Sequence, residues 1–342
     1  MKKKSMLHKS KNILNTKFTL LITGGTGTFG KAFTATILKE FPNIKKIIIY
    51  SRDEFKQNEM ANLPEFNNNP KLRFFIGDVR DRDRLMRAFD NVDVVVHAAA
   101  LKQIPSCENN PFETIKTNIN GAQNVIDAAI DRGVERVVAL STDKACQPIN
   151  LYGATKLCSD KLFIAGNAYA GGKQTRFSVV RYGNVMGSRG SVVPYFQKLI
   201  QDGAKFLPIT DINMTRFWLQ LDEAVDLVIH ALENMVGGEL FIKKIPSIRI
   251  IDLAKAMAPK LPIKEVGVRP SEKIHEMLIS SDDARHALDF PDQYVIQPSF
   301  PWWADRSNYT EGKPVEMNFE YHSGNNSDWL NVSQIRKLLG LI

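Results

Sequence analysis

The feature that most constrains this fold is an alternation of short apolar segments with longer segments typical of helices, which runs from residue 18 to about residue 181. The apolar segments are continuous and rich in Val and Ile, which is typical of strands that helices cover on both faces. Strands separated by helices are joined by right-handed crossovers, so the pattern predicts an α/β fold with a doubly wound parallel sheet. The residues that follow each strand are then the candidate site residues, because ligands of such sheets bind beyond the carboxyl ends of the strands. The expected strands are residues 18–23, 46–50, 72–76, 92–98, 136–140 and 177–181.

A glycine-rich turn follows the first expected strand and leads into a helix expected over residues 31–40. Three glycines spaced three residues apart permit a tight turn and let the backbone approach a pyrophosphate, while the amides at the helix N-terminus attract its charge. Because the turn lies between a strand and a helix, it predicts a Rossmann-like domain that binds a dinucleotide. The expected contacts are Gly24, Thr26, Gly27, Thr28, Phe29 and Gly30.

The end of the second strand bears on which dinucleotide binds. An acidic residue there contacts the ribose 2′-hydroxyl of NAD, whereas arginine accommodates the 2′-phosphate of NADP. Ser51, Arg52 and Lys56 favour NADP, and the neighbouring Asp53 and Glu54 keep NAD as the alternative. After the third and fourth strands, further cofactor contacts are expected from Asp78, Val79, Ala98 and Lys102.

The length of the chain, 342 residues, predicts more than one structural unit, because single cores stop growing at roughly 250–300 residues. Glycines and prolines become frequent after residue 182. We expect the dinucleotide-binding domain over residues 18–182, with residues 214–246 returning to it. Residues 183–213 and 247–342 would then form a smaller C-terminal substrate-binding lobe and a tail.

The net charge of +8 arises mostly from residues 1–17, which contain six lysines and no acidic residue. This distribution predicts a disordered basic extension and gives no indication of a nucleic-acid-binding fold. The apolar run that follows is too short for a signal peptide, and no segment approaches the length of a membrane span. Cys107, Cys146 and Cys158 lack the spacing of metal ligands and suit a reducing compartment. We therefore expect a cytoplasmic protein without a metal site.

Tyr152 and Lys156 are four residues apart in a segment typical of a helix N-terminus, so their side chains share one face. A free tyrosine has a pKa near 10. A neighbouring ammonium group and an oxidised nicotinamide ring are expected to lower that pKa, so that the phenolate accepts a proton from a substrate hydroxyl during oxidation.

Together with the glycine turn, several motifs resemble those of a known family. The chain resembles the extended short-chain dehydrogenase/reductase superfamily and, within it, the inverting UDP-N-acetylglucosamine 4,6-dehydratases of pseudaminic acid biosynthesis. The similarity runs from about residue 20 to the end of the chain. The motifs are residues 77–81, 97–102, 116–118, 141–145, 150–156, 181–185 and 187–192.

The resemblance implies an NADP-dependent hydro-lyase (lyase class) that acts on a nucleotide-sugar. Its product would be a UDP-2-acetamido-2,6-dideoxy-L-arabino-hexos-4-ulose, the first intermediate towards pseudaminic acid for surface or flagellin glycosylation. The resemblance also implies a homo-oligomer. Asn118 and Val185 fall within the motifs and are assigned to the cofactor, although a purely structural role for Asn118 is a competing interpretation.

A 4,6-dehydratase must oxidise C4, remove the C5 proton, expel the C6 hydroxyl and reduce C6. Asp143 is the expected acid at the C6 hydroxyl and Lys144 the expected base at C5. Retaining relatives have Glu where Lys144 stands. To act as a base, Lys144 needs a lowered pKa, which burial and nearby positive charge are expected to give. Thr142 is expected to hydrogen-bond the C4 oxygen, and both Tyr152 and Lys144 are candidates for reprotonating C5.

A diphosphate substrate calls for arginine, whose planar guanidinium matches phosphate oxygens. The resemblance adds Asn184 at the sugar nucleotide and places Arg269 and Glu272 at its nucleotide end; Ser271 stands where the family usually has Gly. His97 is expected to be a hydrogen-bonded core residue rather than a catalyst. The full set of expected substrate contacts is Lys102, Asn184, Arg189, Gly190, Ser191, Val192, Arg216, Arg269 and Glu272.

Two other functions fit parts of the pattern. A sugar-nucleotide epimerase of the same fold needs the tyrosine–lysine pair but no acid–base pair at residues 143–144. A non-catalytic NADP-binding sensor that docks through the basic extension needs neither pair. The presence of both pairs favours the dehydratase.

Overall fold

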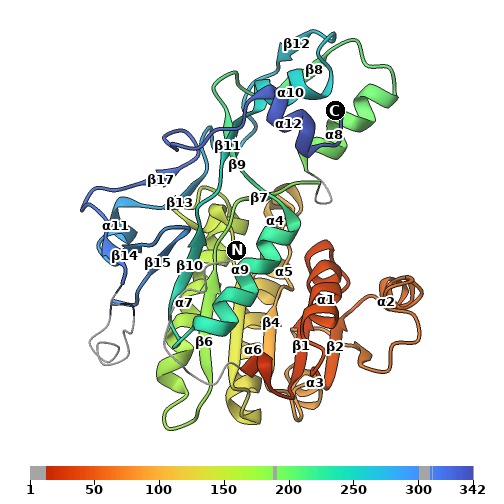
Figure 1. The fold of residues 1–342 in the computed structure, drawn as a ribbon, viewed down its shortest axis with the longest axis vertical. Coiled ribbons are helices and arrows are strands. Elements are labelled where there is room, and N and C mark those ends of the chain that lie inside the picture. The colour runs from red at the N-terminus through yellow and green to blue at the C-terminus, as the bar shows by residue number, and fades with distance from the viewer. Residues whose placement is uncertain (1–12, 188–190, 300–308, 310, 342) are drawn as a thin grey trace.

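The computed structural model describes residues 13–187, 191–299, 309 and 311–341. Its centre is a ten-stranded sheet (Figure 1) of order β16-β14-β15-β10-β6-β5-β4-β1-β2-β3. The strands from β10 to β3 in this order are parallel, and β15, β14 and β16 extend the sheet with antiparallel pairings. The expected doubly wound parallel sheet is thereby confirmed. The strands are β1 (Thr19–Thr23), β2 (Lys46–Ser51), β3 (Leu72–Ile76), β4 (Val94–His97), β5 (Arg136–Leu140), β6 (Arg176–Val180), β10 (Leu240–Lys243), β14 (Ala287–Asp289), β15 (Gln293–Ile296) and β16 (Lys313–Pro314).

Helices cover both faces of the parallel strands because side chains of each strand alternate between two apolar clusters. Leu21 of β1 packs in one cluster with Val125 and Phe163, and its neighbour Ile22 packs in the other with Phe33 and Val228. The first face is covered by α3 (Arg82–Ala88), α6 (Gly121–Arg132) and α7 (Leu151–Tyr169), and the second by α1 (Thr28–Glu40) and α9 (Leu221–Asn234). Shorter helices are α2 (Glu54–Ala61), α4 (Ile104–Asn109), α5 (Pro111–Ile115), a π-helix (Lys116–Asn120) and two 3-10 turns, Ile13–Asn15 and Asp143–Ala145.

A smaller lobe lies beyond the carboxyl ends of the parallel strands (Figure 1). Its apolar cluster includes Phe196, Leu207 and Leu253. The lobe contains α8 (Val192–Gln201), α10 (Ile250–Met257) and α12 (Val332–Leu338) with the strand pair β8 (Leu207–Ile209) and β12 (Ile263–Glu265). Three further strands, β7 (Asn184–Val185), β9 (Thr215–Leu219) and β11 (Ser247–Arg249), form a small sheet. β13 (Met277–Ile279) precedes the short helix α11 (Ser281–Ala284) and pairs with β17 (Tyr321–His322).

The organisation differs from the expected boundaries at two places. Residues 287–296 and 313–314, expected in the lobe and tail, add three strands to the main sheet, whereas β9 pairs outside it. Ile13 and Leu14 are buried in an apolar cluster with α9, so the expected basic extension is shorter than residues 1–17. Residues 1–12 lie outside the described part of the chain. Among the described residues, no helix combines the length and apolar character needed to cross a bilayer.

Candidate active site

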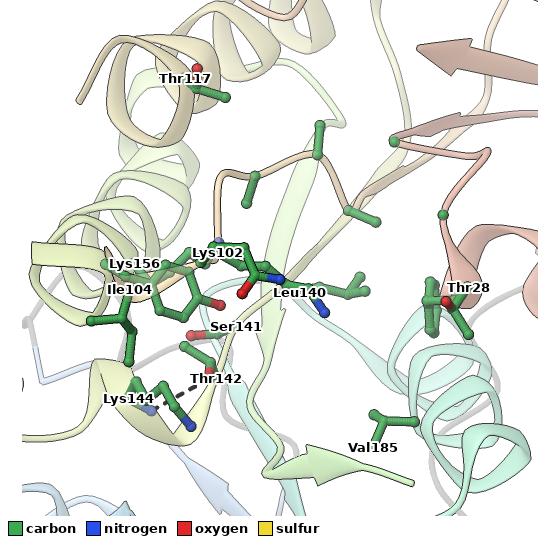
Figure 2. Close-up of a pocket in the computed structure, with 18 of the residues that line it drawn as sticks. Thr28, Lys102, Ile104, Thr117, Leu140, Ser141, Thr142, Lys144, Lys156 and Val185 are labelled. Atoms are coloured by element: carbon green, nitrogen blue, oxygen red, sulfur yellow. Dashed lines mark hydrogen bonds between the residues drawn. The ribbon is translucent and has the colours of Figure 1, made fainter. Parts of the chain in front are cut away.

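A cavity of about 1070 Å³ lies at the carboxyl ends of the parallel strands, and the lobe closes its other side. The expected site residues that line it are Gly24, Thr26, Gly27, Thr28, Phe29, Gly30, Ser51, Arg52, Asp53, Lys56, Asp78, Val79, Ala98, Lys102, Thr142, Asp143, Lys144, Tyr152, Lys156, Asn184, Val185, Ser191, Arg216, Arg269 and Glu272. Figure 2 shows Lys102, Thr142, Lys144 and Lys156 converging from different elements, with Thr28 and Val185 on the other side of the view. The sequence-predicted residues therefore share one cavity.

Five expected contacts are not found there. Glu54, Asn118 and Val192 do not line this cavity. Arg189 and Gly190 lie outside the described residues.

The glycine turn has the shape of an anion cradle. Gly24 has φ = 67°, and a Cβ there would lie 2.9 Å from the Ala99 nitrogen, so only glycine fits. Gly27 is the N-cap of α1 and provides no side-chain cap, which leaves first-turn amides free for a ligand. A pyrophosphate fits this cradle because the backbone approaches it closely and the helix N-terminus favours negative charge.

At the end of β2, the acidic residues are already engaged with neighbours. Asp53 caps α2 by accepting a hydrogen bond from the Lys56 amide at 3.0 Å and forms an ion pair with Lys56 Nζ at 2.6 Å. These contacts hold the pKa of Asp53 below its usual value. Arg52 stays half-exposed at the cavity, 3.7 Å from the Asp78 carboxylate. A half-exposed cationic side chain thus faces the cavity at this point.

The 3-10 turn after β5 carries a buried acid–base pair. Lys144 Nζ donates hydrogen bonds to Asp143 Oδ1 at 3.0 Å and to Asn184 Oδ1 at 3.5 Å. The Thr142 hydroxyl also donates to Asp143 Oδ1, at 2.8 Å. The other carboxylate oxygen, Asp143 Oδ2, is buried without a partner among the described residues. Burial raises the pKa of Asp143 despite the nearby Lys144 ammonium.

The expected lowering of the Lys144 pKa is wrong for the free protein. Burial alone would lower its pKa, but the Asp143 and Glu276 carboxylates outweigh burial and raise it. Glu276 Oε1 lies 3.1 Å from Lys144 Nζ. No motif indicates Glu276, because it stands in an irregular segment more than a hundred residues from Lys144.

Tyr152 and Lys156 lie on the first two turns of α7, whose N-cap Asn150 accepts a hydrogen bond from the Gly153 amide at 2.8 Å. Burial raises the pKa of Tyr152 to about 12, although the Lys144 ammonium and a hydrogen bond with Thr142 act in the opposite direction. The expected lowering of this pKa is therefore wrong for the free protein. Burial lowers the pKa of Lys156, and the Asp160 carboxylate opposes that shift.

Asn118 and His97 do not line the cavity; each forms hydrogen bonds that join elements around the site. Asn118 bonds both backbone groups of Leu101, at 2.8 and 2.9 Å, and the Thr155 hydroxyl at 3.0 Å, so it ties the loop after β4 to α7. The structure thus assigns Asn118 a bracing position rather than the expected cofactor contact. His97 Nδ1 hydrogen-bonds the Thr23 hydroxyl at 2.8 Å in the core, as expected.

The fold and the site define an extended short-chain dehydrogenase/reductase: a glycine cradle after β1 and the Tyr152–Lys156 pair on α7 flank one cavity. The family model described as "Polysaccharide biosynthesis protein" matches residues 20–298, and the chain belongs to this family.

Known relatives align with nearly the whole length of this chain. The UDP-N-acetylglucosamine 4,6-dehydratase (inverting) of Campylobacter jejuni is 54% identical, with coverage of 94% of this chain and 97% of that protein. The UDP-glucose 4-epimerase of Rickettsia conorii is 43% identical, with coverage of 94% and 95%. Among solved structures, that of Pen from Bacillus thuringiensis has a TM-score of 0.86 at 37% identity, covering 96% of this chain and all of that one. The expected resemblance to inverting dehydratases is confirmed.

Proposed function

We propose that the protein is an NADP-dependent, inverting UDP-N-acetylglucosamine 4,6-dehydratase. The observation that carries this proposal is the buried Asp143–Lys144 pair, 3.0 Å apart, in the same cavity as Tyr152 and Lys156. Oxidation of a sugar hydroxyl needs Tyr152 and Lys156, whereas water loss needs an additional acid and base. The C. jejuni relative carries the same activity in its name.

Tyr152 and Lys156 act at the C4 hydroxyl. When bound, the dinucleotide supplies reversible oxidation at C4 with reduction at C6, and its positive ring favours the phenolate. The Lys156 ammonium, buried on α7, stabilises the Tyr152 phenolate, which then accepts the C4 hydroxyl proton and becomes a neutral phenol. The Thr142 hydroxyl holds the C4 oxygen near the phenol.

Asp143 and Lys144 then act at C6 and C5. Transfer of one proton across their 3.0 Å contact breaks a Lys144 N–H bond and forms an Asp143 O–H bond. The neutral amine accepts the C5 proton, which the C4 ketone has made acidic, and the carboxylic acid protonates the C6 hydroxyl, which leaves as water. Each proton lost by one group is gained by another, so the step balances without an added reactant.

The cavity also suits a diphosphate. The buried Arg216 and the exposed Arg269 both line it, and each lies close to Glu272, Arg216 at 3.2 Å and Arg269 at 3.9 Å. Guanidinium groups in this setting can exchange a carboxylate partner for phosphate oxygens. For the cofactor, the half-exposed Arg52 at the end of β2 supports NADP over NAD.

The proposal extends to the biological setting. The 4-keto-6-deoxy product is the first intermediate towards pseudaminic acid for surface or flagellin glycosylation. The three unpaired cysteines favour a reducing, cytoplasmic location, and the resemblance supports a homo-oligomer. Cell fractionation and light scattering of the purified protein test these two assignments.

The decisive experiment is incubation of the purified protein with NADP and UDP-N-acetylglucosamine, followed by mass spectrometry and NMR. We expect loss of one water and an L-arabino configuration at C5. A C4 epimer of unchanged mass would instead support the epimerase that the R. conorii relative suggests. Binding of NADP without any product would leave the sensor interpretation.

A further inference from the structure

Glu276 is a buried carboxylate in the active site for which the proposed mechanism has no role. It precedes β13, and its side chain is 2% exposed. Its backbone is fixed from both sides, since its amide donates to Ser323 Oγ at 2.9 Å and its carbonyl accepts from the Ser323 amide at 2.7 Å. The side chain is thereby held in one place at the cavity.

Glu276 joins the candidate base to a candidate substrate-binding arginine. Its Oε1 lies 3.1 Å from Lys144 Nζ and 3.7 Å from Arg216 Nε. Its second oxygen is buried and has no partner among the described residues. An unshielded buried carboxylate is destabilising by itself, so its position depends on these two cations.

Several elements direct charged or titratable groups at Lys144. They are Asp143 on its own turn, Glu276 before β13, Arg216 on β9, Lys102 after β4 and Tyr152 on α7. The two carboxylates favour the ammonium form, and the cations oppose it. Lys144 and Arg216 hold the pKa of Glu276 below its usual value even though burial acts to raise it. Glu276 thus remains ionised against Lys144.

We propose that Glu276 is a positioning residue that holds Lys144 Nζ against Asp143. This inference rests on the proposed function, because it assigns Lys144 the role of base at C5. Without Glu276, Lys144 loses one of its two carboxylate contacts, so its proton passes to Asp143 or to solvent more readily and its position becomes less fixed.

The test compares Glu276→Gln with Glu276→Asp and with a matched control, Glu272→Gln. Glu272 contacts Arg216 at 3.2 Å and, among the described residues, forms no ion pair with Lys144, whose ion-pair partners are Asp143 and Glu276. Two quantities are measured for each variant: the pH dependence of kcat, and the pH dependence of Lys144 acetylation in the free protein by competitive labelling and mass spectrometry.

For Glu276→Gln we expect the Lys144 labelling midpoint and the rising limb of kcat to move to lower pH by about one unit or more. The maximal kcat should also fall, by up to about 100-fold, because the base is misplaced. Glu276→Asp keeps the charge and should return the labelling midpoint towards that of the wild type. Glu272→Gln should leave both midpoints in place, whatever its effect on KM.

Unchanged Lys144 labelling in Glu276→Gln overturns the inference, and so does an equal shift in Glu272→Gln. If Glu276→Gln fails to fold, Glu276→Asp decides through kcat, because its shorter side chain keeps the charge but moves the carboxylate away from Lys144 Nζ: a lowered kcat supports the inference, and an unchanged kcat overturns it. Labelling needs no substrate. A wild-type protein that releases no water from UDP-N-acetylglucosamine therefore refutes the proposed function while the labelling still tests the contact.

Discussion

At the scale of single residues, Asp143 and Lys144 are unusual because they are adjacent, oppositely charged and both directed into the interior. Burying an ion pair incurs a desolvation penalty that its attraction often fails to offset. A surface turn after a strand would leave such a pair in water. Its burial beside Tyr152 is therefore better explained by chemistry than by stability.

Removing either member of this pair should stop dehydration and spare the cofactor. We expect Lys144→Ala and Asp143→Asn each to lower water release by about 10²–10⁴-fold, the usual contribution of one general acid or base. NADP should bind both variants as it binds the wild type, because the glycine cradle is formed by the turn between β1 and α1, which neither change alters. Water release is followed by mass spectrometry and binding by titration. Lys161→Ala, an exposed change on α7, is the control, and near-wild-type turnover in both active-site variants would remove the mechanism.

The second prediction at the scale of single residues concerns Arg52 and the choice between NADP and NAD. Arg52→Asp should weaken NADP binding more than NAD binding, because it replaces the cation available to a 2′-phosphate with an anion. The loss for NADP should be about 1.5–3 kcal/mol, the contribution of a hydrogen bond to a charged group. Dissociation constants for both dinucleotides, measured beside the exposed variant Arg87→Asp, check this. An equal or greater loss for NAD would assign NAD as the cofactor.

At the scale of elements, the site depends on how closely α7 packs against the 3-10 turn of residues 143–145. The two elements touch at Gly153, where a Cβ would collide with the Lys144 carbonyl oxygen and lie 3.1 Å from Pro148 Cβ. No larger residue fits unless the two elements separate. Glycine here is required by close approach, since its φ is not in the left-handed region.

Gly153→Ala should therefore affect stability and catalysis together. We expect about 1–3 kcal/mol of destabilisation from overpacking, and a kcat lowered by up to about 100-fold as Lys144 shifts. Urea unfolding and steady-state kinetics measure the two effects. Gly172→Ala, at a turn where a Cβ meets nothing within 4 Å, should change neither. A stable Gly153→Ala with wild-type kcat would show that the packing tolerates separation.

The elements that the sequence predicts well are those with local causes. β1 to β6 are continuous apolar runs, and the glycine turn and the Tyr152–Lys156 spacing are set within a few residues of chain. The short strands β7, β11, β16 and β17 have two or three residues each, too few to show a period, and their pairing depends on distant partners. Glu276 was not predicted because its contacts are with Lys144 and Arg216, which are distant in the sequence. The directions of the Tyr152 and Lys144 pKa shifts were wrong because burial and Glu276 determine them, and neither is visible in a motif.

At the scale of the whole molecule, the cavity is assembled from two parts of the chain. The parallel sheet supplies the glycine cradle, the Tyr152–Lys156 pair and Lys144, and the segments after β6 supply Arg216 and Glu276. Lys144 and Glu276 thus come from segments more than a hundred residues apart in the sequence and meet at 3.1 Å. β13, which follows Glu276, packs in the same apolar cluster as the parallel strands, so the Lys144–Glu276 contact is held by the core of the sheet domain.

The stability of the molecule as a whole should depend on pH through His97, which lies at the end of β4 in the centre of the sheet. Burial, and then the charge of Lys156, lowers the pKa of His97 to about 3 from an ordinary value of 6.5. Between these values the unfolded chain binds a proton that the folded protein excludes, so this contribution is complete above pH 6.5 and is lost as pH falls. The loss should be about 1.4 kcal/mol per pH unit.

Urea unfolding of wild type and His97→Asn from pH 7.5 to pH 4.5 isolates this effect. Asn retains a polar atom near Thr23 but cannot titrate, so the unfolding free energy of the variant should fall less steeply, by about 2–3 kcal/mol over the range. Carboxylates such as Asp160 and Glu239, whose pKa values burial raises, contribute equally to both proteins and cancel in the difference. His286→Asn, an exposed change, should keep the wild-type slope. Equal slopes for wild type and His97→Asn would mean that His97 gains its proton without unfolding, and that the centre of the sheet admits water.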